Sequence, residues 1–159
     1  MPNWCENRVE ISLDESVDGK AFLLNYGEIH HKGGNDYLWK LDYNNLIPTP
    51  DEVLKTLDDD TNSKSNKYQT PGSKRPYWYN WRNYYWGVKW NAVSAETDDK
   101  SNWIQVKYNK EWNNSISFSY ETPWKPPGGI AKAFWELEEV DDVVWFYDEP
   151  GMRFAGYLH

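Results

Sequence analysis

The residues that could act in catalysis are few, and the clearest is a lone cysteine. A cysteine nucleophile needs a lowered thiol pKa and usually a histidine base beside it. The chain has one cysteine, Cys5, and three histidines. His30 and His31 lie in a predicted loop, and His159 is the last residue, so the sequence places no base beside the thiol. A free cysteine of this kind is typically buried and inert, and we predict no catalytic residue.

Two stretches match metal-binding patterns only in part. Asp58, Asp60 and Asn62 match the start of a calcium-binding loop, but Ser63 stands where that loop has glycine, and no glutamate closes it. The adjacent histidines at 30–31 are a weak pair, because neighbouring residues rarely point at one ion and no third ligand accompanies them. We therefore predict no metal site and no cofactor.

Three carboxylates lie at predicted strand ends, where the acid and base of a glycosidase could sit. They are Glu121, Asp148 and Glu149. Nothing in the sequence gives their separation, and carboxylates at strand ends are usually solvated. The chain also has no phosphate loop, nucleophile elbow or zinc pattern. An enzyme with an unrecognised site therefore ranks third among the functions we consider.

The stretch NYYWGVKWNA, at 83–92, concentrates aromatic rings around a lysine. Trp86, Lys89 and Trp90 could form a stacking platform of the kind that single-stranded nucleic-acid binders use. If residues 86–90 are extended, however, both tryptophans share one face and Lys89 lies on the other, which favours the core. We predict that both rings mainly fix the fold. The candidate surface for a ligand or partner comprises Trp86, Lys89, Trp90, Asn91, Glu121 and Trp124.

The composition indicates one aromatic-rich, acidic domain spanning 1–159. Aromatic residues make up 18% of the chain, with 11 tryptophans and 12 tyrosines, so large rings are expected to build the core. The formal net charge of -8 argues against duplex DNA, since phosphate contacts dominate the affinity of DNA-binding proteins. It favours a basic protein surface as partner. One cysteine and no apolar run of membrane-spanning length predict a cytoplasmic protein.

Hydrophobic periodicity predicts the elements that would position these residues. Strands are expected at 8–13, 89–96, 102–109 and 114–121, helices at 17–26, 51–57 and 130–137, a helical or irregular segment at 77–85, and a loop at 30–36. A hairpin is expected at 142–159, and we expect its first run, VVWFY at 143–147, to be a central strand covered on both faces. The polar stretch 58–76 is expected to be a mobile loop.

The order of these elements matches the split βαβ plan of ferredoxin-like domains. We therefore expect an α+β fold with an antiparallel sheet, two main helices on one face, and an inserted aromatic and polar segment.

Four blocks of the sequence carry a resemblance to a known family. They are MPNWCENRVEI at 1–11, DYNNLIPTP at 42–50, YWGVKWNA at 85–92 and FSYETPWKPPGGIAKAF at 118–134. On these blocks the chain resembles the Api92-like proteins, also described as plasmid YubB-like proteins with a ferredoxin-like domain. It departs from the family pattern at Tyr85, where asparagine is usual, and at Val88, where threonine is frequent.

The resemblance implies a ferredoxin-like fold and an origin in phages, plasmids or integrated elements, but no reaction and no catalytic residues. Our leading hypothesis is a small acidic protein that binds a host protein, in host takeover or counter-defence. The alternative is a nucleic-acid-binding domain that uses an aromatic sheet face, with single strands favoured over duplex DNA.

Overall fold

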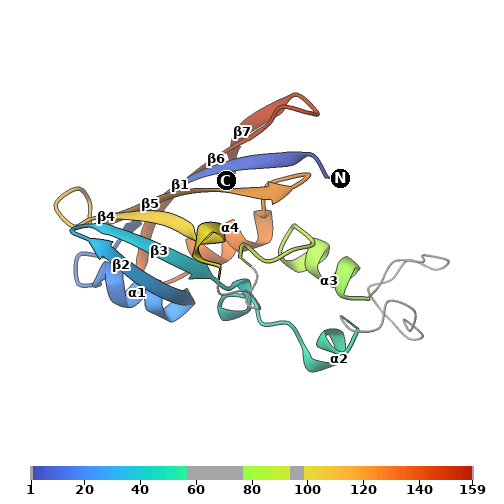
Figure 1. Ribbon diagram of the computed structural model, residues 1–159, viewed down its shortest axis with the longest axis horizontal. Coiled ribbons are helices and arrows are strands. Elements are labelled where there is room, and N and C mark those ends of the chain that lie inside the picture. Colours follow the sequence, from blue (N-terminus) through green and yellow to red (C-terminus); the bar gives the residue numbers. More distant parts are fainter. Residues whose placement is uncertain (1, 57–76, 94–98, 159) are drawn as a thin grey trace.

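A computed structural model describes residues 2–56, 77–93 and 99–158, and all structural statements below concern those residues (Figure 1). The expected mobile loop at 58–76, the partial calcium pattern within it, and His159 lie outside the described residues.

The described chain forms a mixed α+β fold around one seven-stranded antiparallel sheet. The strands lie in the order β2-β3-β4-β5-β1-β6-β7. Their bounds are β1 Trp4–Leu13, β2 Gly27–Gly33, β3 Asp36–Leu41, β4 Ile104–Asn109, β5 Ser115–Pro123, β6 Val140–Glu149 and β7 Phe154–Leu158. Four α-helices accompany them: α1 Gly19–Tyr26, α2 Asp51–Leu54, α3 Tyr77–Tyr85 and α4 Gly128–Trp135. Short 3-10 turns lie at Tyr43–Asn45 and Lys100–Asn102.

Helices α1 and α4 cover one face of the sheet (Figure 1). Asp18 caps α1 by accepting a hydrogen bond from the Ala21 amide. The ring of Phe22 in α1 lies 6.3 Å from that of Phe134 in α4, and Phe134 lies 6.4 Å from Trp145 in β6. The expected core of large rings is therefore confirmed, and it lies between these helices and the sheet.

A buried polar network joins the three adjacent strands β5, β1 and β6. Asn7 in β1 donates hydrogen bonds to the Tyr120 carbonyl and, at 2.8 Å, to Thr122 Oγ1. Its own side-chain oxygen accepts a 2.9 Å hydrogen bond from Trp145 Nε1. Because a shift in register would leave these buried groups unpaired, the network helps to fix how the strands align.

Two of the expected segments are wrong in the described residues. The expected loop at 30–36 is largely hairpin, because His30 and His31 continue β2 and pair with β3. The expected strand at 89–96 is not a strand over 89–93. Gly87, at φ 90°, turns the chain after α3, and the Asn91 side chain then accepts hydrogen bonds from the amides of Tyr43 and Ala92. Residues 94–96 lie outside the described part.

The expected central position of VVWFY is also wrong. Strand β6 is second from the edge of the sheet, next to the five-residue β7. Its side chains alternate, with Trp145 buried and Val144 46% exposed. The reason is that helices cover only one of its faces, so the outward residues of the apolar run meet solvent.

Candidate partner-binding face of the sheet

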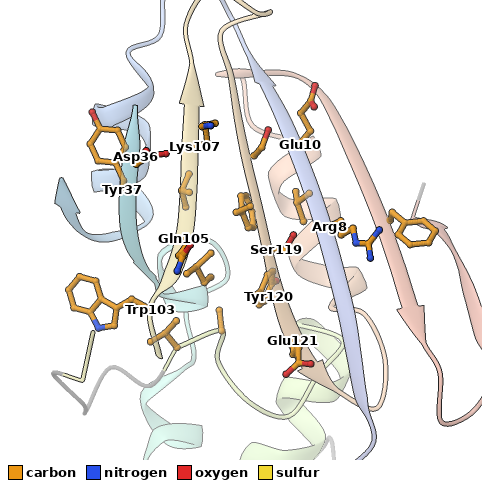
Figure 2. Close-up of a pocket in the computed structure, with 18 of the residues that line it drawn as sticks. Arg8, Glu10, Asp36, Tyr37, Trp103, Gln105, Lys107, Ser119, Tyr120 and Glu121 are labelled. Atoms are coloured by element: carbon orange, nitrogen blue, oxygen red, sulfur yellow. The ribbon is translucent and has the colours of Figure 1, made fainter. Parts of the chain in front are cut away.

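The sheet face opposite α1 and α4 carries no described helix, and we call it the open face. Its side chains line a shallow hollow of about 1560 Å³. Figure 2 shows Arg8 and Glu10 from β1, Ser119 and Glu121 from β5, and Lys107 from β4 around this hollow. Alternate residues of β1 face it because successive side chains point to opposite sides of a strand.

Three carboxylates form a row across adjacent strands of the open face. Glu6 in β1 is directly opposite Glu121 in β5 and directly opposite Asp148 in β6. Directly opposed residues have Cβ atoms about 5 Å apart and point to the same side. We call Glu121, Glu6 and Asp148 the acidic row. The structure thus brings together two of the carboxylates singled out in the sequence, with Glu6 between them.

The next pair of residues along the same strands, Arg8 in β1 and Phe146 opposite it in β6, places a cation beside aromatic rings. The Arg8 Nε atom lies 3.0 Å from a Glu6 carboxylate oxygen, and its guanidinium carbon lies 5.8 Å from the centre of the Phe146 ring. Hydrogen bonding to Glu6 raises the pKa of Arg8 further above its usual value. The Phe146 ring in turn lies 5.3 Å from Tyr157 in β7. Arg8 is therefore already paired with Glu6, and its charge also interacts with that of Asp148.

The two halves of the open face differ in charge. On β1, β5 and β6, four carboxylates surround Arg8: Glu6, Glu10, Glu121 and Asp148. On the β3 and β4 side, Lys107 is directly opposite Asp36. On the same side Trp103 packs against His30, with the two ring centres 4.8 Å apart. Lys40 Nζ lies 5.7 Å from the centre of the Trp103 ring. The acidic charge is thus concentrated on strands β5, β1 and β6.

A group of half-exposed tryptophans lies at the Trp4 end of β1, and we call Trp4, Trp90 and Trp124 the tryptophan corner. They are 42%, 40% and 45% exposed. The rings of Trp4 and Trp90 are 6.0 Å apart, and the Trp124 amide donates a 2.7 Å hydrogen bond to the Asn3 carbonyl. Lys89 Nζ lies 4.3 Å from the centre of the Trp90 ring.

The candidate residues of the 83–92 stretch therefore divide into two groups. Trp86 is fully buried and donates a 3.0 Å hydrogen bond to the Ile47 carbonyl, which confirms its predicted core position. The same prediction is wrong for Trp90, because the turn at Gly87 stops residues 86–90 from being one extended strand. Asn91 braces the turn at Tyr43 rather than facing the hollow.

Cys5 is buried in the sheet, as expected. It is fully inaccessible to solvent, and burial, followed by the nearby charge of Glu149, raises the pKa of its thiol to about 11. The native protein should therefore react with a thiol reagent at pH 8 at least about 100-fold more slowly than the urea-unfolded chain, because the thiolate is scarce and shielded. Timed absorbance with a chromogenic disulfide reagent measures this. Equal native and unfolded rates would contradict the placement.

The third candidate carboxylate is structural. Glu149 is buried and accepts hydrogen bonds from the amides of Gly151 and Met152 in the turn that leads to β7. Glu121 is solvent-exposed on an open sheet, whereas the general acid of a glycosidase lies in an apolar enclosure. Of these two carboxylates, only Glu121 lines the hollow of the open face.

Sequence reasoning missed several contributors to the open face, among them Trp4, Glu6 and Arg8 on β1. The spacing of two residues between Trp4, Glu6 and Arg8 was a usable signal, because alternation in WCENRVEISL places them on the side opposite Cys5, Val9, Ile11 and Leu13. In the described ranges no group of three or more His, Cys, Asp or Glu is arranged to hold a metal ion. No helix there is long and apolar enough to span a bilayer.

Searches with the chain among protein-family models, curated proteins and solved structures find no match. The inferences below therefore depend on the sequence and the geometry.

Proposed function

We propose that this protein binds a basic surface of a host protein through the acidic half of its open face. The observation that carries the proposal is the segregation of charge: four carboxylates and one arginine, already paired with Glu6, occupy strands β5, β1 and β6. Complementary charge guides association and selects partners. A face that was covered by helices or carried no charge would not favour a basic partner in this way.

We also propose that the sheet is an enlarged ferredoxin-like domain. Supporting this, strands β6-β1-β5-β4 are adjacent in that order, α1 follows β1, and α4 follows β5, as in the split βαβ plan. The β2–β3 hairpin with α2 and α3 would be an insertion, and β7 an addition at the edge. The sequence blocks described above support membership of the Api92-like family, a phage or plasmid origin, and action in the host cytoplasm.

The role of the open face can be tested by blocking it. Ser119 lies at its centre and is exposed, so Ser119→Trp should obstruct docking without disturbing the core. Tagged wild-type protein is expected to retain a discrete host protein from nuclease-treated lysate, and Ser119→Trp should lose it. Asn25→Trp, on the exposed side of α1, is the matched control and should retain it. Equal retention by both variants would contradict docking on the open face.

The alternative function, single-stranded nucleic-acid binding, is favoured by one observation. Phe146 and Tyr157 lie in contact beside Arg8 on the open face, and stacking on rings contributes roughly 1–3 kcal/mol per base. The adjacent acidic row opposes it, since phosphates would meet unpaired carboxylates.

Fluorescence anisotropy with labelled oligonucleotides near physiological ionic strength separates these functions. We expect no duplex binding at micromolar protein, because the net charge is -8 and phosphate contacts dominate duplex affinity. Tight duplex binding with a steep salt dependence would overturn the protein-partner proposal. Binding to single strands that is lost in Phe146→Ala would establish the alternative instead.

A further inference from the structure

The acidic row is unfavourable for folding, and its charges are only partly offset. Like charges directly opposite each other across strands destabilise a sheet. Arg8 pairs with Glu6, whereas Glu121 and Asp148 form no ion pair with any residue in the described part of the chain. Stability is often given up at functional sites, where stabilising changes tend to cost activity. Two carboxylates on one face are thus left available to a cation from outside.

The tryptophan corner lies beside this row. Trp4 precedes Glu6 by two residues in β1 and shares its side of the sheet, and Trp4 is opposite Pro123, two residues beyond Glu121. The contact between Lys89 and Trp90 shows that an indole face of the corner accepts a cation. Rings and carboxylates side by side are the two features that hold a guanidinium, which stacks on aromatic faces and donates two parallel hydrogen bonds to a carboxylate.

We infer that the acidic row and the tryptophan corner together form a docking surface for an arginine-bearing segment of a partner protein. The inference rests on the proposed function and specifies its chemistry: the partner's guanidinium stacks on Trp4 and pairs with Glu121 or Asp148. Arginine is the favoured cation because its planar guanidinium can lie flat on a ring and also donate two parallel hydrogen bonds to one carboxylate, whereas the ammonium group of lysine is a point charge that can do neither. Charge complementarity selects this occupant over a nucleic acid, whose phosphates the row repels.

The probe for this site is a labelled (Arg-Gly)4 peptide, titrated with the full chain at physiological ionic strength and followed by anisotropy. Glu121→Gln with Asp148→Asn is expected to weaken binding at least tenfold while the melting temperature stays equal or rises, since like-charge repulsion is relieved. Trp4→Leu should also weaken binding. Glu111→Gln with Glu138→Gln changes the net charge equally at exposed positions off this face, and should alter the Kd less than twofold.

Three outcomes would overturn the inference. They are no binding of the arginine peptide, equal weakening by both charge-matched pairs, or equal affinity for a (Lys-Gly)4 peptide. The proposed function is tested separately by Ser119→Trp. If that variant loses the host protein while the arginine peptide fails to bind, then the open face is the interface and only the arginine chemistry is wrong.

Discussion

Trp86→Ala is expected to lower the free energy of unfolding by about 3–5 kcal/mol, the usual cost of truncating a fully buried aromatic side chain. The Trp86 ring lies 5.3 Å from Tyr43 and 5.9 Å from Trp81, and the guanidinium carbon of Arg82 lies 4.7 Å from its centre. Truncation would open a cavity among these groups and leave the Ile47 carbonyl without its indole donor.

Trp90→Ala is the matched control. It removes the same kind of side chain only four residues along the chain, and Trp90 is 40% exposed. It should cost about 1 kcal/mol, the scale of a single aromatic or cation contact. Urea unfolding followed by circular dichroism compares the two variants. Equal losses of stability would contradict the division of this stretch into a buried and an exposed tryptophan.

Gly129→Ala should destabilise the protein by about 3 kcal/mol or more, at the upper end of what overpacking costs. A Cβ at Gly129 would overlap the Tyr85 carbonyl oxygen and approach the Trp86 carbonyl carbon to 3.1 Å. Both obstacles are backbone at the end of α3, so no side chain can rotate away. The same close approach allows the Gly129 amide to donate a 3.1 Å hydrogen bond to the Trp86 carbonyl.

Gly128→Ala provides the control for this effect. A Cβ at Gly128 would meet no atom within 4 Å. Alanine is favoured over glycine in a helix interior by about 1 kcal/mol, and Gly128, as the first residue of α4, should show only part of this gain. Thermal unfolding should therefore show Gly128→Ala equal to or slightly more stable than the parent, whereas Gly129→Ala melts at a much lower temperature. Similar melting temperatures for both variants would show that α3 and α4 can move apart.

Most of the described strands and helices could be predicted because their signals are local. In β1 and β5 the alternation of apolar and polar residues follows the two-residue repeat of a strand, and the apolar stripe of α4 follows the helical repeat. The burial of Cys5 could also be predicted, because a free cysteine without a nearby histidine base is typically buried and inert. The His30–His31 segment misled because polar residues and glycines are equally suited to a loop and to an edge strand.

The candidate surface depended on contacts between distant parts of the chain. Sequence alone determined that the protein is acidic, aromatic-rich and α+β. Composition gives the charge and the number of rings, and the spacing of apolar residues shows which side of each segment is buried away from water. Only the tertiary structure decided that Glu121 and Asp148 flank Glu6, since strand pairing joins residues more than a hundred positions apart. It also decided that Trp86 is buried while Trp90 is half exposed, because the turn at Gly87, which packs against α4, directs the two rings into different surroundings.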